Sequence, residues 1–131
     1  MDKQKKDLSM RESSHVGSFG SLMTMIRQQI EAGAFRREDQ YQVEEIVRIL
    51  AEMFVLPADV TVSIGGIKMP VAFVREIYGI LEHDHVELVL QQYKKQTHAI
   101  RCPKSYLRTA LYNAAFELES RVTNDVQQDL T

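Results

Sequence analysis

The sequence predicts a mainly α-helical protein, a compact bundle of about five helices with one small β-hairpin. Apolar residues recur at three- and four-residue steps in five separate stretches, which is the period of an amphipathic helix. One other stretch, residues 60–69, places Val, Thr and Ile around a Gly-Gly pair, as β-hairpins do. Hydrophobic residues make up 44% of the chain and charged residues 26%, which is ordinary for a globular domain with a buried core.

The 131 residues suffice for one domain, and their composition divides them into three parts. We predict a flexible, polar N-terminal arm (residues 1–20), a single helical domain (21–121) and a flexible, polar C-terminal tail (122–131). One cysteine cannot form an internal disulfide, and the sequence contains neither a signal peptide nor an apolar run long enough for a membrane span. These features predict a cytoplasmic protein with no membrane partner.

The clearest helix is the last one, predicted over residues 103–121. Pro103 fits the first helical position, where its missing N–H costs nothing, and Cys102 is then a weak N-cap. Lys104 and Arg108, one turn apart, lie away from the apolar face. The residues that share that apolar face are Tyr106, Leu107, Ala110, Leu111, Ala114 and Leu118.

Four further helices are predicted from the same period, over residues 22–32, 40–56, 70–81 and 85–96. Ser21 is the expected N-cap of the first of them, and Gly33 is its expected end. Two pairs of residues have the spacing of a capping box: Asp39 with Gln42, and Asp84 with Glu87.

The turn of the hairpin is predicted at Gly65-Gly66, with positive φ at one or both glycines. An isolated hairpin is marginally stable in water, so this one is expected to pack on the helices. A glycine pair can also approach a phosphate group, but the further glycines and the lysine of a P-loop are missing, which favours a plain turn.

No set of residues has the spacing of a catalytic or metal site. His83, Asp84 and His85 cluster at a predicted helix start, but zinc needs four tetrahedral ligands, and no further Cys or His pair at metal spacing accompanies them. Cys102 stands at a helix N-terminus, a position that lowers a thiol pKa, yet no paired base is identifiable. We therefore predict no enzymatic activity, no metal and no cofactor, and interpret the histidines as cap and surface residues.

One charge feature is unusual, although the formal net charge is only −2. From Gln91 to Arg108 the chain contains no Asp or Glu, and His98, Tyr93 and Tyr106 are interleaved with five cations. We call these cations the basic band: Lys94, Lys95, Arg101, Lys104 and Arg108. A basic band at a helix–loop–helix corner suits phosphate groups, an acidic partner protein, or simple charge balance in solvent.

The helix dipole distinguishes the members of this band. Lys94 and Lys95 end a predicted helix, where cations are favourable, whereas Lys104 and Arg108 begin one, where they are not. Lys104 therefore gains nothing locally. This mismatch favours an external anion, and a nearby Glu in the folded chain would explain it equally well.

The run Ile100-Arg-Cys-Pro-Lys-Ser-Tyr-Leu-Arg-Thr-Ala-Leu-Tyr-Asn-Ala114 is the most specific segment of the chain. It follows the pattern Ile-Arg-Asn-x-Lys-x-Tyr-Leu-x-Thr-Ala-Leu-Tyr-Asn-Ala, and here the chain resembles the small helical domain at the C-terminus of RepA-type replication initiator proteins of Gram-positive plasmids and conjugative elements, a domain of unknown function. The less specific segments are Val43-Glu-Glu-Ile-Val47, Val62-Ser-Ile-Gly-Gly66, Met69-Pro70 and His85-Val-Glu-Leu-Val-Leu90. The resemblance runs without a gap from Val62 to Ala114 and covers residues 22–56 more weakly.

Two positions depart from the family pattern. Cys102 replaces an Asn, which weakens the cap, and Ala115 stands where Pro is usual, so a longer last helix is expected. The winged-helix DNA-binding domain of the initiators has no counterpart in this chain, so origin recognition is not implied. The order of the last two helices is also similar, more loosely, to the C-terminal domain of DnaD-like primosome proteins, which bind DNA and help to load helicase.

The resemblance implies a non-enzymatic binding module of a plasmid or mobile-element replication system. Such a module would contact host primosome proteins, DNA, or both, with weak and non-specific binding to the DNA backbone. The alternative is a structural or oligomerisation domain without nucleic-acid contact. In either case the basic band supplies the candidate phosphate- or partner-binding residues.

Overall fold

The computed structural model of the chain describes residues 18–96 and 99–130, with side chains as far as Leu118 in the last helix. These residues form five α-helices and a two-stranded antiparallel β-hairpin, which confirms the predicted fold class. Within the described ranges no helix is long and apolar enough to cross a membrane.

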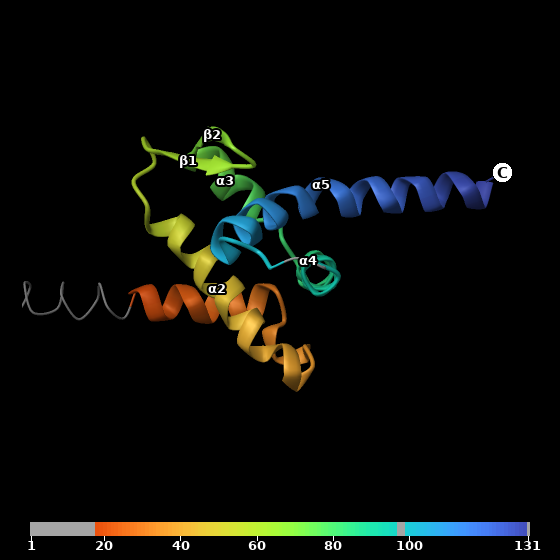
Figure 1. Ribbon diagram of the computed structural model, residues 1–131, viewed down its shortest axis with the longest axis horizontal. Coiled ribbons are helices and arrows are strands. Elements are labelled where there is room, and N and C mark those ends of the chain that lie inside the picture. The colour runs from red at the N-terminus through yellow and green to blue at the C-terminus, as the bar shows by residue number, and fades with distance from the viewer. Residues whose placement is uncertain (1–17, 97–98, 131) are drawn as a thin grey trace, which may run out of the picture.

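The elements follow one another with short connections (Figure 1). A first helix covers residues 18–29, and two 3-10 turns connect it to α2. The labelled elements are η1 (Ala32–Ala34), η2 (Arg37–Asp39), α2 (Gln40–Val55), β1 (Thr61–Ile64), β2 (Ile67–Pro70), α3 (Val71–Tyr78), α4 (His83–Lys94) and α5 (Pro103–Leu130). Figure 1 shows the end of α5 extending away from the other elements.

The core lies where α5 crosses the other helices, and α5 contacts α2, α3, α4 and β1. As predicted, Leu107, Ala110, Leu111 and Ala114 are buried, whereas Tyr106 and Leu118 are half-buried. The other helices contribute their predicted apolar faces. The buried residues of those faces include Ile26, Ile30, Val43, Ile46, Val47, Leu50, Val71, Val74, Tyr78, Val86, Val89 and Leu90. Phe35, between the first helix and α2, is also buried in the core.

The hairpin has the predicted two-residue turn. β1 and β2 pair in the register Thr61 with Pro70, Val62 with Met69, Ser63 with Lys68, and Ile64 with Ile67. Gly65 has φ of 60° and Gly66 has φ of 83°, the two positive values that a type I′ turn requires. The Gly65 N–H donates a 2.9 Å hydrogen bond to Thr109 Oγ1 of α5, which fixes the turn on the helical body.

The first helix differs from the prediction at both ends. Residues 18–20 are helical, so Ser21 lies inside the helix instead of capping it, and residues 1–17 of the predicted arm lie outside the described residues. The left-handed residue that follows the helix is Glu31, with φ of 51°, and the predicted stop, Gly33, lies within η1. A non-glycine residue accepts this conformation where its neighbours determine the backbone path.

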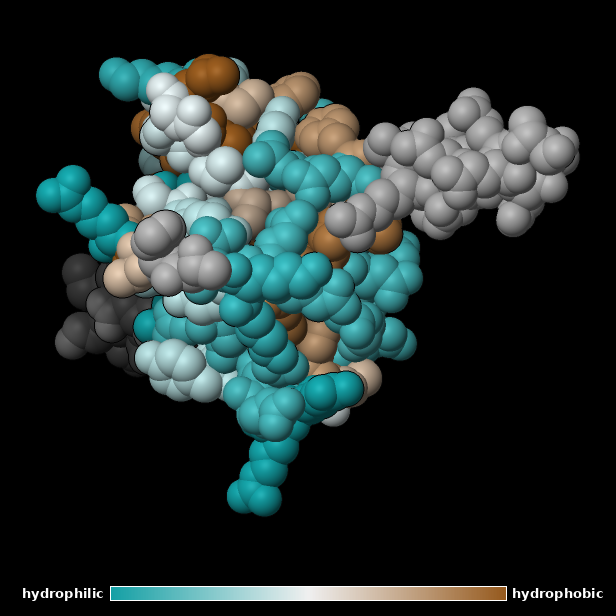
Figure 2. Space-filling model, turned by 45° about the vertical axis from the view of Figure 1, so that its right-hand side comes forward, coloured by the Kyte–Doolittle hydropathy of each residue, from teal (hydrophilic) through white to brown (hydrophobic). Residues whose placement is uncertain are grey.

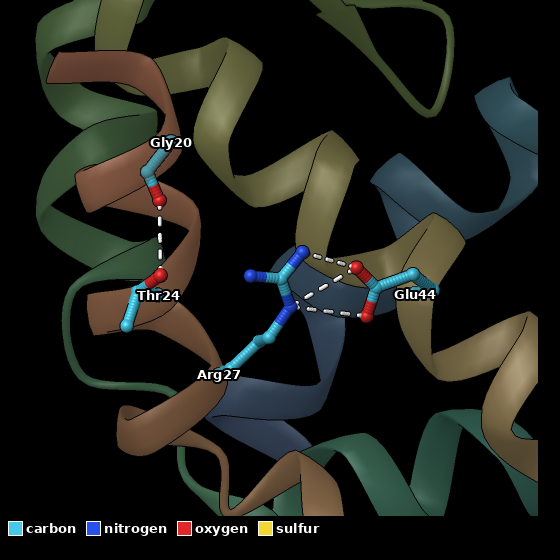
Figure 3. A network of polar contacts seen from close by, with 4 residues as sticks. All are labelled: Gly20, Thr24, Arg27 and Glu44. Carbon is cyan, nitrogen blue, oxygen red and sulfur yellow. Dashed lines mark hydrogen bonds and ion pairs between the residues drawn. The ribbon is translucent and has the colours of Figure 1, made fainter. Parts of the chain in front are cut away.

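The first helix is fixed to α2 by a charged contact that the sequence does not reveal. Figure 3 shows the Arg27 guanidinium reaching across to the Glu44 carboxylate, with Nε donating to Oε1 at 3.0 Å and to Oε2 at 3.2 Å. The Arg27 guanidinium lowers the pKa of Glu44 below its ordinary value, and the carboxylate in turn raises the pKa of Arg27. Both side chains are partly exposed, so the pair positions the helix and contributes little stability.

Both predicted capping boxes are wrong. At the start of α2, the Asp39 carboxylate makes no cap hydrogen bond. The α4 helix begins at His83, two residues earlier than predicted, because the Glu82 N–H donates to Nδ1 of His85 at 2.9 Å. The imidazole thus occupies the place of the expected carboxylate.

Helix α3 spans Val71–Tyr78 and is shorter than the predicted 70–81. Pro70 is its N-cap and also the last residue of β2. At the other end, Gln29 Nε2 of the first helix donates to the carbonyls of Tyr78 at 3.1 Å and Leu81 at 2.7 Å. These hydrogen bonds give the carbonyls at the end of α3 a partner, so no further helical turn is needed to supply one.

Helix α5 begins at Pro103 as predicted and ends at Leu130, beyond the predicted end near residue 121. The expectation of a longer helix, based on Ala115 in place of Pro, is therefore confirmed. The helix includes residues 122–130 of the predicted tail, and Thr131 lies outside the described residues.

Removing the most deeply buried leucine of α5 tests the position of the core. Leu111→Ala should lower the free energy of unfolding by about 2–5 kcal/mol, because the side chain is fully buried and the substitution leaves a cavity. Met25→Ala is the control, since this side chain is 64% exposed on the first helix, and it should change stability by less than about 0.5 kcal/mol. Urea denaturation followed by circular dichroism measures both, and equal effects would place Leu111 outside the core.

The turn geometry makes a separate prediction about backbone strain. A Cβ at Gly66 would meet no atom within 4 Å, so Gly66→Ala should destabilise the fold only through its positive φ, by about 1–2 kcal/mol. A Cβ at Gly33 also meets open space, but φ there is not positive, so Gly33→Ala should be neutral or slightly stabilising. Thermal denaturation of both variants measures the difference, and an unaffected Gly66→Ala would contradict the type I′ turn.

Candidate functional site

The basic band lies at the corner where α4 ends and α5 begins, but the structure assigns different roles to its members. Lys94, in the last turn of α4, places Nζ 2.6 Å from Oδ1 of Asp39. Asp39 is buried at the start of α2, so the pair joins the end of one helix to the beginning of another. Each charge also lies at the helix end that its sign favours. Lys94 therefore has a structural role.

Lys104 is also engaged within the chain. Its Nζ lies 2.6 Å from Oε2 of Glu52, which projects from α2 toward the first turn of α5. The carboxylate offsets the unfavourable position of a cation at a helix N-terminus. Of the two explanations for Lys104 that the sequence left open, the structure contains the nearby Glu.

Arg108 is half-buried and faces the interior of the fold. Its backbone carbonyl accepts a 2.7 Å hydrogen bond from the Tyr78 hydroxyl, and its Nε is buried without a hydrogen-bond partner in the described residues. Burial raises the pKa of the Tyr78 phenol, and the charge of the nearby Arg108 opposes that shift. The side chain is thus less available to an external anion than its sequence position suggests.

Lys95 and Arg101 are the two members of the basic band that remain exposed and make no ion pair within the described part of the chain. They flank the connection between α4 and α5, and His98 between them lies outside the described residues. The aromatic residues predicted among the cations hold this corner together. The Tyr93 and Tyr106 rings meet edge to face at 5.9 Å, and Gln96 Nε2 lies 3.0 Å from the Tyr106 hydroxyl.

The histidine cluster divides between two tasks. His85 caps α4, and the His83 ring stacks on Phe35 with centroids 4.1 Å apart. The Nδ1 of His83 lies 3.8 Å from Asp84 and 3.9 Å from Glu87, so these three residues have the donor atoms and proximity that a metal ion needs. Both carboxylates are exposed, as surface acids commonly are. The predicted lack of a metal stays a prediction.

Cys102 is exposed and unpaired in the described part of the structure. The backbone N–H of Ser105, and then its hydroxyl, lower the pKa of the thiol, as a position before a helix N-terminus favours. No base is identified beside it, so the thiol remains a bystander in our interpretation.

The structure also contains a groove that sequence reasoning missed. A cavity of about 440 Å³ lies between the hairpin, α5 and α4. Its floor includes four polar residues of α5 at four-residue steps, which therefore form one row: Ser105, Thr109, Asn113 and Glu117. The hairpin contributes Ser63, Gly65 and Gly66, and α4 contributes Gln92, whose Nε2 donates to Glu117 at 2.8 Å. The four-residue spacing of hydroxyl and amide residues was the signal available in the sequence.

Apolar surface gathers at the end of the molecule formed by the hairpin and α3. Figure 2 shows this concentration at the top of the molecule, whereas most of the remaining visible face is hydrophilic. Ile67 is 67% exposed there. Phe73 of α3 and Phe116 of α5 are half-exposed, and both rings contact Tyr112 at centroid distances of 6.4 and 5.4 Å. These three rings form an aromatic row along the seam between α3 and α5.

Comparison with known protein families matches residues 4–131 to a family of unknown function, DUF6017. Because the match covers nearly the whole chain, the protein belongs to this family. No curated protein and no solved structure matches it. Family membership thus assigns no activity, and nothing in these comparisons connects the chain with RepA-type or DnaD-like domains.

The two neighbouring lysines of α4 provide a test of the structural assignment. Lys94→Ala should lower the free energy of unfolding by about 1–3 kcal/mol, because it leaves the buried Asp39 carboxylate without its partner. Lys95→Ala removes the same charge from the next position and should change stability by less than about 0.5 kcal/mol. Urea denaturation at low salt compares them. If both variants lower the free energy of unfolding by the same small amount, Lys94 has no structural role and is available for binding.

Proposed function

We propose that this protein is a non-enzymatic binding module of a plasmid or mobile-element replication system, which contacts primosome proteins and, weakly, the DNA backbone. The observation that carries the DNA contact is the pair of exposed cations, Lys95 and Arg101, in a stretch of the chain without Asp or Glu. The assignment to replication is supported by the resemblance of residues 100–114 to the C-terminal domain of RepA-type initiators. A cytoplasmic location belongs to the same proposal.

The ion pairs of Lys94 and Lys104 set the strength of this proposed contact. Phosphate would have to compete with Asp39 and Glu52 for these lysines, so their contribution to binding is small. Two contacts, from Lys95 and Arg101, correspond to a log–log salt slope of about −1.8 on duplex DNA and about −1.4 on single strands. All five cations would instead produce about −4.5 and about −3.5. Binding should therefore be weak and only moderately dependent on salt.

A structural or oligomerisation domain is the second candidate function. The aromatic row of Phe73, Tyr112 and Phe116 favours it, because aromatic residues are enriched in protein interfaces. In that case the basic band balances charge and needs no nucleic acid. Removal of Lys95 and Arg101 distinguishes the two functions, because only the proposed DNA contact depends on these two cations.

Titration of labelled single- and double-stranded DNA at several salt concentrations tests the proposal. The double variant Lys95→Ala/Arg101→Ala should abolish the weak binding, because it removes the two unpaired cations. The matched control Arg37→Ala/Lys68→Ala removes the same charge from exposed positions elsewhere and should bind DNA like the unaltered protein.

Three results would count against the proposed DNA contact. They are a lack of binding even at low salt, binding that the Lys95→Ala/Arg101→Ala variant retains, and equal losses in both double variants. The last of these would indicate a general effect of net charge without a defined surface.

A further inference from the structure

The two open edges of the hairpin differ in what they offer to another chain. Ile64 and Ile67 flank the two-residue turn and therefore form a hydrogen-bonded pair. Pairs alternate along antiparallel strands, so Val62 and Met69 form the next one. A 3.0 Å bond from the Val71 N–H to the Val60 carbonyl continues the alternation.

It follows that the residues between these pairs direct their backbone groups outward. On β2 the outward positions are Lys68 and Pro70. Proline has no N–H to donate, and lysine on an edge discourages the approach of another strand. On β1 the outward positions are Thr61 and Ser63, which are exposed and carry neither protection. One edge of the hairpin is therefore guarded, and the other is open.

The open edge borders the groove described above at its Ser63 end, near the turn. Ser63 lines the cavity of about 440 Å³, the polar row of α5 forms its floor, and Gln92 of α4 also lines it. Six of its ten lining residues carry a hydroxyl or amide group, and apolar atoms also contribute to its surface. Its one carboxylate, Glu117, already accepts a hydrogen bond from Gln92. The groove thus combines unpaired backbone donors and acceptors on one wall with neutral polar side chains on the floor.

We infer that β1 accepts an extended segment of a partner protein, which adds a third strand to the hairpin and lies along the polar row of α5. The backbone of Thr61 and Ser63 supplies the donors and acceptors for such a strand. Alternate side chains of the bound segment face α5, where Ser105, Thr109 and Asn113 favour small, hydroxyl or amide groups. The other side chains face solvent and are less restricted.

Two other occupants fit this groove less well. A second copy of this chain would have to pair its own β1, which lies in the same recess against α5, so two folded bodies obstruct each other's edges. A nucleic-acid strand needs cations for its phosphates, and the groove lining contains no Lys or Arg. The inference concerns a surface separate from the basic band and holds whether or not the protein binds DNA.

Selection from a library of random linear peptides provides the probe, and the best peptide is then synthesised with a fluorescent label. We expect the affinity of the peptide to depend on its backbone N–H groups at every second residue. N-methylation at the positions that pair with β1 should weaken binding roughly tenfold or more, whereas N-methylation at the alternate positions should not.

Matched proline variants test the edge itself. Ser63→Pro removes the outward N–H of β1 and leaves the inter-strand bonds intact, so it should weaken peptide binding roughly tenfold. Lys68→Pro makes the equivalent change on the edge of β2 and should bind like the unaltered protein. Circular dichroism confirms that both variants fold. If Ser63→Pro does not fold, the N-methylation pattern on the unaltered protein decides the question.

Four results of the peptide experiments would overturn the inference: no selected peptide that binds better than its scrambled version, binding indifferent to N-methylation, binding that Ser63→Pro and Lys68→Pro weaken equally, or binding lost in the Lys95→Ala/Arg101→Ala variant. The last would place the peptide on the basic band. Self-association of the protein that Ser63→Pro abolishes, without peptide binding, would make a second copy the occupant and also overturn it.

Discussion

Burial of one face of α5 is the constraint on which the rest of this structure depends. Leu107 and Leu111 are buried on that face, and the small Ala114 lets neighbouring helices approach closely. Helices α2, α3 and α4 and strand β1 all pack on this one helix. Because a helix cannot bury its whole circumference in so small a body, the row from Ser105 to Glu117 stays outside the core and becomes the floor of a groove. The same element therefore organises both the interior and the floor of this groove.

A second feature of the fold is that distant side chains satisfy the helix ends. Arg75 of α3 donates through Nε to the Met53 carbonyl at 3.0 Å and through a second nitrogen to the Leu56 carbonyl, both at the end of α2. The Tyr78 hydroxyl donates to the Arg108 carbonyl, which satisfies the only polar group of a fully buried ring. Bonds of this kind tie the ends of α2 and α3 to other elements, so polar contacts as well as packing specify the orientation of these helices.

The difference between local sequence signals and contacts of distant side chains explains which features the sequence predicts. The helices and the hairpin are predictable because the period of apolar residues and the Gly65-Gly66 pair are local signals. Helix ends are less predictable, because a carboxylate such as Asp39 can be taken by Lys94 from a distant part of the chain. The basic band shows the same limit. Its composition is plain in the sequence, but the pairing of Lys104 with Glu52 requires the fold. The groove combines three elements, and only the spacing of its α5 residues is visible in advance.

The Gln29 amide has a consequence for the order in which this protein folds. It joins the first helix to the end of α3 across 49 positions of sequence, so the contact forms only after α2 and the hairpin have brought the two ends together. Helix α3 has only eight residues and is too short to be stable in isolation. We therefore expect its C-terminal turn to form late in folding. The first helix and the end of α3 then belong to one cooperative unit, although they lie far apart along the chain.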